Sequence, residues 1–298
     1  MKKKTEQLEK NAKPFLKWAG GKTKLIPEIS KRLPKLDNIT YIEPFIGGGS
    51  LMFYIAQNFN IKEAIINDIN IDVISCYNSI KSEPENLIKK LSNLEEQFHN
   101  LETVQEKTDF YLDIRNKFNL KNLNTLDNAT LMIFLNKTCF NGLYRVNKKN
   151  QFNVPFNKVL KPTICDEENI MNCHKLLQKV TILNGDYSET LKYSNEDSFF
   201  YFDPPYKPIS ETASFNSYNK ESFEDLEQKK LCDFCKLIDS KGGKWLLSNS
   251  DMKNVDETNN FFDDMYSDFN IQRIKSKRMI NSKGDNRGEI DEVLISNS

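Results

Sequence analysis

The most specific chemical pattern in the sequence is Asp203-Pro204-Pro205-Tyr206, which directly follows the apolar segment 198–202. The Asp203 carboxylate and the Pro204 carbonyl are two hydrogen-bond acceptors on a backbone that consecutive prolines hold rigid. Together they can accept both N–H bonds of an amino group on a nucleobase, so that its nitrogen becomes tetrahedral and nucleophilic. Tyr206 offers a ring on which a base flipped out of a duplex can stack. The pattern therefore predicts a site that methylates a nucleobase amino group.

A second pattern predicts a nucleoside cofactor. Residues 43–50, Glu-Pro-Phe-Ile-Gly-Gly-Gly-Ser, follow an apolar segment and precede a helical one. Gly47 and Gly49 can let the backbone pass close to a ligand at the start of that helix. Asp68 ends the next apolar segment, where an acid can bind the two hydroxyl groups of a ribose. Because glycine-rich turns alone are common, it is the combination with Asp68 that indicates a cofactor.

Residues 14–22, Pro-Phe-Leu-Lys-Trp-Ala-Gly-Gly-Lys, offer the remaining parts of a cofactor site. With Thr23 they end like a phosphate-binding P-loop, but Leu16 stands where that loop needs its first glycine, and no strand precedes them. The segment instead combines the aromatic ring of Trp18, a flexible turn and the cation Lys22. Such a set suits the methionine end of S-adenosylmethionine, with Lys22 facing its carboxylate.

The elements that must position these residues follow from the hydrophobic pattern. Four short apolar segments are each followed by turn residues and a helical pattern, namely 39–45, 63–67, 198–202 and 244–247. This alternation is typical of an open α/β sheet with mostly parallel strands, which binds ligands at the carboxyl ends of its strands. Residues 73–161 interrupt it with amphipathic helical patterns at 85–98 and 107–118 and then an aromatic, Asn-rich and basic segment. We expect a mainly helical subdomain inserted into an α/β domain.

The charge distribution indicates nucleic acid as a partner. The chain has 42 Lys and Arg against 42 Asp and Glu, so its net charge is zero, yet residues 115–161 and 271–288 are both strongly basic. Such stretches can supply the phosphate contacts that dominate DNA affinity. No apolar run approaches the roughly 18 residues that a membrane-spanning helix needs. Residues 1–13 have too few apolar side chains to anchor them and are expected to form a flexible tail rather than a signal peptide, in a cytoplasmic protein with no membrane partner.

The six cysteines are scattered along the chain, which fits a reducing compartment better than a disulfide framework. Cys232 and Cys235 have the spacing of a zinc-binding pair. They lie within a helical pattern at 223–238, however, and no second pair completes a site. We expect them to pack a helix, and we predict no metal.

These motifs resemble those of the Dam family (D12 class) of bacterial and phage DNA adenine-N6 methyltransferases. The resemblance runs from about residue 14 to residue 297, with all motifs in the family's order. The segments that carry it are 15–22, 43–50, 67–70, 141–145, 152–156, 201–206, 247–250 and 289–292. The resemblance implies a Rossmann-like S-adenosylmethionine-dependent methyltransferase sheet formed by residues 14–72 and 162–298, with residues 73–161 as an inserted, mainly helical target-recognition domain. It implies a cofactor site composed of Trp18, Lys22, Phe45, Gly47, Gly49, Asp68, Asp186 and Asp203.

The resemblance also implies how DNA is read. Arg145 matches the arginine with which the family reads a guanine, a pairing for which two donors are suited. Leu143 and Pro155 match apolar positions that contact bases. Phe140 takes the place of an aromatic residue that fills the stack around the flipped adenine, although it lacks the hydroxyl of the tyrosine found in some relatives. The predicted DNA-binding set is completed by Asn141, Asn147 and Lys158. Family members with Asn-Gly-Leu-x-Arg and Asn-Val-Pro-Phe recognise GATC, so the same target is expected here.

Two other functions stay open at this point. Enzymes that methylate cytosine N4 more often begin the catalytic loop with serine, so Asp203 argues against that reaction. A DNA-binding regulator that holds the cofactor without turnover is the second, and intact Asp203 and Tyr206 argue against it. The expected partner is double-stranded DNA, bound by a monomer or by a dimer on DNA. A cognate restriction endonuclease could belong to the same system, without a direct complex.

Overall fold

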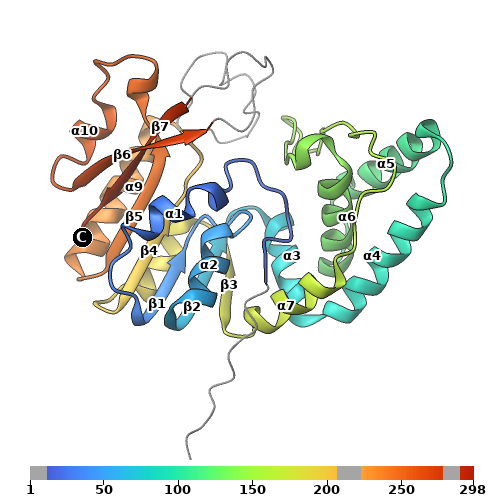
Figure 1. Ribbon diagram of the computed structural model, residues 1–298, viewed down its shortest axis with the longest axis horizontal. Coiled ribbons are helices and arrows are strands. Elements are labelled where there is room, and N and C mark those ends of the chain that lie inside the picture. The colour runs from blue at the N-terminus through green and yellow to red at the C-terminus, as the bar shows by residue number, and fades with distance from the viewer. Residues whose placement is uncertain (1–11, 207–222, 278–288) are drawn as a thin grey trace, which may run out of the picture. The chain divides into compact units, whose positions relative to one another are not determined.

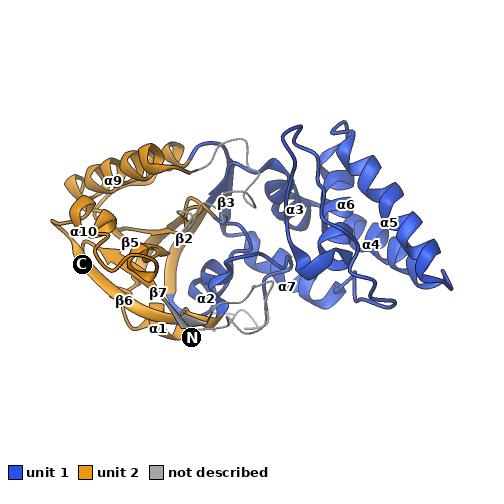
Figure 2. Cartoon of the chain, turned by 90° about the horizontal axis from the view of Figure 1, so that it is seen from above, with its two compact units in different colours: residues 1–23, 46–59, 66–186 blue, residues 24–45, 60–65, 187–298 orange. Residues whose placement is uncertain are grey.

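The structure, a computed structural model, describes residues 12–206, 223–277 and 289–298 of the 298-residue chain. The chain divides into two compact units, which Figure 2 shows in different colours. Unit 1 comprises residues 1–23, 46–59 and 66–186, and unit 2 comprises residues 24–45, 60–65 and 187–298. This division rests on compactness alone, and the functional boundaries expected from the sequence stay a prediction.

Seven strands form one sheet in the order β3-β2-β1-β4-β5-β7-β6 (Figure 1). Their bounds are β1 Asp37–Glu43, β2 Asn60–Asp68, β3 Val180–Asn184, β4 Ser198–Phe202, β5 Lys244–Ser250, β6 Asn270–Lys277 and β7 Glu289–Ser296. Strand β4 is parallel to β1 and β5, whereas β7 is antiparallel to β5 and β6. The order is that of a doubly wound Rossmann sheet except that β7 is inserted between β5 and β6. The predicted Rossmann-like α/β class is therefore confirmed.

The central strands of unit 2 are buried on both faces, and side chains alternate between the two faces along each strand. Phe200 and Phe202 of β4 both meet Phe234 of α9 (Asp225–Ser240) edge-on. Tyr201 points to the other face, on which its register partner Leu246 of β5 also lies. Helix α1 (Ile26–Ser30) covers that second face, opposite α9 (Figure 2). The remaining short helices are η3 (Tyr187–Tyr193), η4 (Met252–Asn254) and α10 (Phe261–Met265), while η1 (Lys22–Lys24) spans the junction of the two units in the sequence.

Unit 1 is mainly helical. Its helices are α2 (Ser50–Asn58), α3 (Ile71–Ser82), α4 (Pro84–His99), α5 (Val104–Asn119), α6 (Thr125–Thr138) and α7 (Glu167–Leu177), followed in the α6–α7 connection by the short turn η2 (Phe140–Gly142). Helix α5 begins with a capping box between Thr103 and Glu106, which satisfies two backbone N–H groups that the helix itself leaves unpaired. The core contains edge-to-face aromatic pairs such as Phe98 and Phe134, whose ring centroids are 5.6 Å apart.

Most elements expected from the sequence are present with shifted ends. Strand β4 has the predicted bounds, and the helical patterns at 85–98 and 107–118 correspond to α4 and α5. The last two residues of the expected tail, Ala12 and Lys13, are hydrogen-bonded to side-chain amides of unit 1. The backbone of Ala12 exchanges hydrogen bonds with the side-chain amide of Gln57, and Lys13 does the same with Asn169. The composition of the segment does not indicate these amide partners, because both are far away in the sequence. Residues 1–11 of the expected tail lie outside the described residues.

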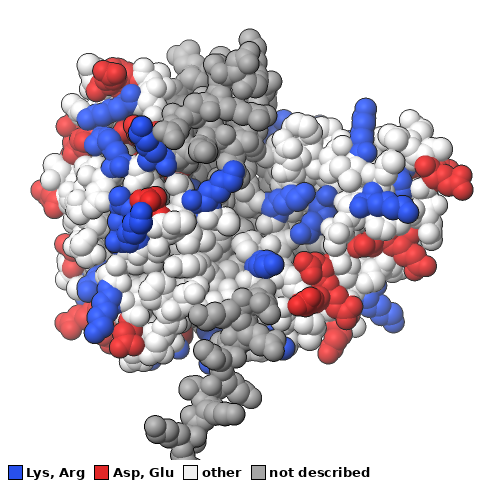
Figure 3. Space-filling view, viewed as in Figure 1, with Lys and Arg blue, Asp and Glu red and all other residues white. Residues whose placement is uncertain are grey.

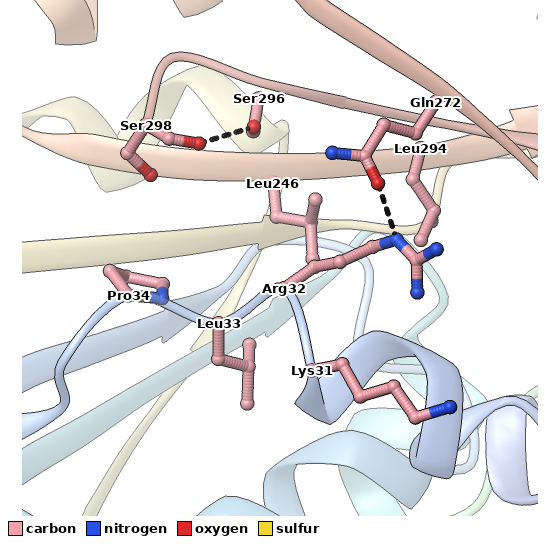
Figure 4. A pocket seen from close by; sticks show the side chains of 9 residues that line it. All are labelled: Lys31, Arg32, Leu33, Pro34, Leu246, Gln272, Leu294, Ser296 and Ser298. Atoms are coloured by element: carbon pink, nitrogen blue, oxygen red, sulfur yellow. Dashed lines mark hydrogen bonds between the residues drawn. The ribbon is translucent and has the colours of Figure 1, made fainter.

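A cavity of about 480 Å³ lies in unit 2 between the segment that follows α1 and strands β5 to β7 (Figure 4). Arg32 crosses it and donates from Nε to Gln272 Oε1 at 2.6 Å. The described residues that line it, Lys31, Arg32, Leu33, Pro34, Leu246, Gln272, Leu294, Ser296 and Ser298, include none to which the sequence assigned a role. Separately, no helix among the described residues is long and apolar enough to cross a membrane.

Candidate active site

The catalytic pattern predicted from the sequence lies at the carboxyl edge of unit 2's central strands. Asp203 directly follows β4, and the carboxyl ends of β1, β4 and β5 share one edge because the strands are parallel. Ser248 of β5 donates from Oγ to Asp203 Oδ1 at 3.3 Å. The Tyr201 hydroxyl lies 3.0 Å from the same Oγ. A buried serine and tyrosine on neighbouring strands thus orient the Asp203 carboxylate.

Tyr206 is held by its hydroxyl group. It donates to Glu292 Oε2 at 2.7 Å, and Glu292 is a buried residue of β7 that lies opposite Ser250 of β5. Burial, followed by the nearby carboxylates of Asp203 and Glu292, raises the pKa of Tyr206 well above its ordinary value. The side chain therefore stays a neutral phenol, whose ring position is set by the hydrogen bond to Glu292.

The proline turn is attached to α9 and β5 as well. Gln228, a fully buried residue of α9, donates from Nε2 to the Pro205 carbonyl at 3.4 Å. Its Oε1 atom accepts a hydrogen bond from Asn249 Nδ2 of β5 at 3.3 Å. The two proline residues differ in exposure, since Pro204 is buried and Pro205 is exposed. The turn is consequently held by a side chain of α9 that is itself held by β5.

In unit 1, Asp68 at the end of β2 is built into the glycine-rich turn. Its Oδ2 atom accepts the Gly47 N–H at 3.0 Å, and its Oδ1 atom accepts the Asn70 N–H at 2.9 Å. Burial raises the pKa of Asp68, and the backbone N–H groups of Asn70, Gly47 and Ile69 oppose that shift. Each carboxylate oxygen has a second lone pair, so the group can still accept hydrogen bonds from two hydroxyls.

Trp18 packs directly on the glycine-rich turn. Gly47 has a φ of +44°, and a Cβ atom added there would lie 2.6 Å from Trp18 Nε1. A Cβ atom added at Gly48 would lie 2.9 Å from the Trp18 Cβ atom. Both separations are too short for a side chain, so the indole ring and the turn require glycine at both positions. Trp18, Gly47 and Asp68 therefore lie next to one another in unit 1.

The other expected cofactor residues have varied surroundings. Lys22 is buried, and its Nζ atom donates to the Gly20 carbonyl at 2.8 Å. Gly49 caps the start of α2. Asp186 is exposed and follows Gly185, whose N–H donates to the Asp68 carbonyl at 3.3 Å, so it lies beside the end of β2. Phe45 belongs to unit 2, where its ring packs 5.3 Å from that of Tyr187 and 5.8 Å from that of Phe223.

The expected DNA-binding residues of unit 1 lie in or next to one irregular hairpin, residues 139–157, which we call the recognition hairpin. Two isolated antiparallel bridges join its arms, Cys139 with Phe156 and Val146 with Phe152. Side chains of α5 form hydrogen bonds with its backbone. Asn119 donates to the Phe152 carbonyl and accepts from the Phe152 N–H, and Tyr111 donates from its hydroxyl to the Val154 carbonyl at 2.7 Å.

Arg145 is oriented within the hairpin by Asn153, a residue for which the sequence suggested no role. Arg145 donates from Nε to Asn153 Oδ1 at 2.7 Å and from Nη2 to the Asn153 carbonyl at 3.4 Å. The Asn153 N–H donates to the Arg145 carbonyl at 3.0 Å. The terminal guanidinium nitrogens are the atoms that pair with a guanine edge. Asn153 therefore fixes the orientation of the guanidinium through Nε and through one terminal nitrogen.

The rest of the recognition hairpin presents groups to solvent. Phe140 is half exposed, with 50% of its surface accessible, although it is a large apolar side chain. Asn141 has a φ of +55° at the turn that follows α6. Pro155 and Lys158, the latter just beyond the hairpin, are exposed, whereas Leu143 and Asn147 are half-buried. The side chain of Asn147 accepts the backbone N–H groups of Lys149 and Gln151 and thus shapes the hairpin tip.

Basic side chains lie over the part of unit 1 that carries α5 and α6, with acidic side chains gathered mainly below them (Figure 3). The stretch 115–161 is less available to DNA than its composition implied. Lys121 pairs at 2.8 Å with the buried carboxylate of Asp72, and Lys117 pairs with Asp113 at 2.7 Å. Most of the second basic stretch, residues 278–288, lies outside the described residues.

Cys232 and Cys235 are both buried in α9, as expected for residues that pack a helix. Burial raises the pKa of the Cys232 thiol to about 11, so it is protonated at neutral pH. Within residues 12–206, 223–277 and 289–298, no group of three or more His, Cys, Asp or Glu side chains could hold a metal ion.

Sequence reasoning assigned no role to Ser248, Gln228, Glu292 and Asn153. Ser248, Asn153 and Glu292 fall in segments that carry the resemblance to the Dam family, which was the available signal. Nothing local to those segments shows what each side chain contacts, because each partner lies on a different arm or strand.

The chain is similar to known proteins over nearly its whole length. The family of D12 class N6 adenine-specific DNA methyltransferases matches residues 18–280. The chain is 48% identical over 293 residues to the type II methyltransferase M.MjaIII of Methanocaldococcus jannaschii, which covers 96% of this chain and 99% of that protein. It is 39% identical over 292 residues to the type II methyltransferase M1.LlaDCHI of Lactococcus lactis, covering 96% of each. It is 31% identical over 285 residues to the DNA adenine methylase of Escherichia coli K12, covering 96% and 95%.

Proposed function

This chain belongs to the D12 class of N6 adenine-specific DNA methyltransferases, and we propose that it transfers the methyl group of S-adenosylmethionine to an adenine flipped out of double-stranded GATC. The family makes it a DNA adenine-N6 methyltransferase. The methyl donor, the flipping of the base and the target sequence are the proposed parts.

The observation that carries the proposal is the supported Asp203 carboxylate at the carboxyl edge of β4. Ser248 and Tyr201 fix its orientation before substrate arrives, so little reorganisation is needed when it accepts an N–H from the adenine amino group. The Pro204 carbonyl is proposed to accept the second N–H. Tyr206, held through Glu292, is proposed to stack on the flipped base. The reaction needs no covalent bond between enzyme and base.

The residues of unit 1 fit an adenosine cofactor. Asp68 is the proposed acceptor of the ribose hydroxyls, since both its oxygens keep acceptor capacity beside the Gly47 and Asn70 N–H groups. Trp18 and the glycine-rich turn form an apolar wall, and Lys22, Gly49 and Asp186 are proposed to complete the part of the site that unit 1 contributes. The roles of Phe45 and Asp203 of unit 2 in cofactor binding stay predictions from the family resemblance. When bound, S-adenosylmethionine supplies an electrophilic methyl group on a sulfonium.

The GATC target rests on the recognition hairpin. We propose that Arg145, oriented by Asn153, reads a guanine, and that Phe140 fills the stack that the flipped adenine leaves. Leu143 and Pro155 are proposed to contact bases, with Asn141, Asn147 and Lys158 supporting the contact with DNA. Residues 73–161 are the proposed target-recognition domain. Because two relatives are named type II methyltransferases, a cognate restriction endonuclease is also proposed, with no direct complex.

The test is transfer of labelled methyl from S-adenosylmethionine to duplexes that differ only in GATC. We expect label on adenine in the GATC duplex and none in a duplex with one guanine changed. Label on adenine in another sequence would overturn the target but not the chemistry. Label on cytosine N4 would contradict the proposed reaction, and binding without any label would favour a silent DNA-binding regulator.

A further inference from the structure

Tyr144 joins the proposed cofactor site to the recognition hairpin, and all the residues involved lie in unit 1. The Tyr144 ring stacks on Trp18, with ring centroids 5.6 Å apart and planes inclined by 26°. Trp18 in turn packs on the backbone of Gly47, whose N–H is bonded to Asp68. Tyr144 also immediately precedes Arg145 in the chain. One ring therefore separates the cofactor wall from the residue proposed to read guanine.

The other end of Tyr144 is held by a buried carboxylate. Its hydroxyl donates to Asp72 Oδ2 at 2.7 Å, and the Asp72 side chain is only 4% exposed. Asp72 also accepts from Asn128 Nδ2 at 3.1 Å and pairs with Lys121 Nζ at 2.8 Å. Asp72 lies in the first turn of α3, which begins just after Asp68 and Asn70. The phenol is thus fixed to the element that follows the proposed ribose-binding acid.

A second contact links the same two regions independently of Tyr144. Asn136 of α6 is almost fully buried, and its amide accepts the Lys17 N–H and donates to the Lys17 carbonyl, both at 2.8 Å. The same Nδ2 atom donates to the Gly142 carbonyl at 3.0 Å. Gly142 has a φ of +63°, and a Cβ atom added there would collide with the Lys17 side chain. The backbone beside Trp18 is therefore bound to the turn that begins the recognition hairpin.

We propose that Tyr144 is a positioning residue that couples cofactor binding to reading of the target sequence. This inference rests on the proposed function of Trp18, Asp68 and Arg145. A cofactor that fixes Trp18 restrains the ring stacked on it, and with it the backbone that carries Arg145. Cofactor binding then favours the hairpin arrangement that reads DNA, and cognate DNA must raise cofactor affinity by the same factor.

The experiment measures this factor by calorimetry with the non-reactive cofactor analogue sinefungin. Its dissociation constant is determined without DNA, with a saturating duplex that the wild-type enzyme methylates, and with a duplex that differs by one guanine. For the wild type we expect the methylated duplex to tighten binding about tenfold, within the usual range of coupling between sites. The changed duplex should have little effect.

Two variants separate the contacts that Tyr144 makes. Tyr144→Phe keeps the stack on Trp18 and loses the hydrogen bond to Asp72, while Lys121 and Asn128 still satisfy that carboxylate. We expect its coupling factor to fall to about threefold, and that of Tyr144→Leu, which also lacks the stack, to fall to about one. Tyr193→Phe in unit 2 removes a hydroxyl far from these contacts in the sequence and should keep the wild-type factor.

The outcomes are distinct. If both Tyr144 variants keep the wild-type coupling factor, or lose sinefungin affinity equally with and without DNA, Tyr144 is a structural residue and the inference is wrong. A wild-type factor of one also overturns the inference while leaving the proposed function intact. Failure of the wild type to bind sinefungin at all would instead count against the proposed cofactor, and methylation of a different sequence would count only against GATC.

Discussion

The catalytic turn of unit 2 and the recognition hairpin of unit 1 are positioned in different ways. Asp203 follows a strand of five buried residues, flanked on both sides by parallel neighbours whose backbones are hydrogen-bonded to it. The recognition hairpin has only two isolated bridges of its own and depends on side chains of α5 and α6, such as Asn119 and Asn136.

The difference indicates how the two tasks are divided. Regular backbone pairing holds Asp203, the proposed catalytic acceptor, within the narrow limits that chemistry at one nitrogen atom requires. Because the recognition hairpin is bonded to helices, we expect substitutions in the hairpin to leave the structure of the sheet unchanged. Changes to the catalytic turn should therefore affect the chemical step, and changes to the hairpin should affect the choice of target.

The largest effect is expected from Asp203→Ala. Removing one preorganised acceptor should lower kcat by about 10²–10³-fold, because the carboxylate acts on the amino group in the transition state. DNA affinity, measured by fluorescence anisotropy, should change little. The matched control is Asp197→Ala, an exposed aspartate just before β4, which should keep wild-type kcat. A large loss of DNA affinity in Asp203→Ala would contradict the proposal that the catalytic turn affects the chemical step alone.

Arg145→Ala should instead relax the choice of target. Losing a bidentate contact with guanine should reduce discrimination at that base by about 1–3 kcal/mol, or roughly 5- to 150-fold in kcat/KM. Lys149→Ala, at the exposed hairpin tip, should weaken all duplexes alike and reduce the salt dependence of binding by about one unit. Full discrimination in the Arg145 variant would contradict its role as a base reader.

Glu292→Gln is expected to have a smaller effect on the chemical step. The amide keeps the shape of the side chain but weakens the hydrogen bond that holds the Tyr206 hydroxyl, so we expect kcat to fall by about tenfold. Tyr206→Phe breaks the same bond from the other side. If Glu292 acts through Tyr206, the double variant should be no slower than the slower single variant. Additive losses would show that the two residues act separately.

The smallest effect on catalysis is expected from Asn119→Ala, which tests the support of the hairpin. The change removes both hydrogen bonds to the backbone of Phe152 and should lower the free energy of unfolding by about 1–3 kcal/mol. It should also reduce discrimination between duplexes, with kcat on saturating cognate DNA close to that of the wild type. Asn58→Ala in α2, whose exposed amide bonds only within its own helix, is the control for stability. A large fall in kcat would contradict independent support of the two regions.

Local patterns were sufficient for the elements that carry the chemistry. The strand before Asp203, the glycine-rich turn beside Asp68 and the helices α4 and α5 follow from hydrophobic periodicity and turn residues, which act over a few positions. The hydrogen-bond partners of the site residues could not be predicted from these local patterns. Nothing near Glu292 in the sequence shows that β7 is inserted antiparallel beside β5, which is what brings its carboxylate to Tyr206.

The sequence by itself determined which groups are available for the proposed chemistry, namely the acceptors of residues 203–206, the proposed ribose-binding acid Asp68 and the basic segment proposed to read DNA. Only the tertiary structure decided how each is held or neutralised. By composition Lys121 is one of the cations predicted to bind DNA, yet in the structure it pairs with buried Asp72. The sequence suggests no role for Tyr144, whose ring stacks on Trp18 in the structure. The physical reason is that these contacts join residues far apart in the chain, and strand register and helix packing set their distances.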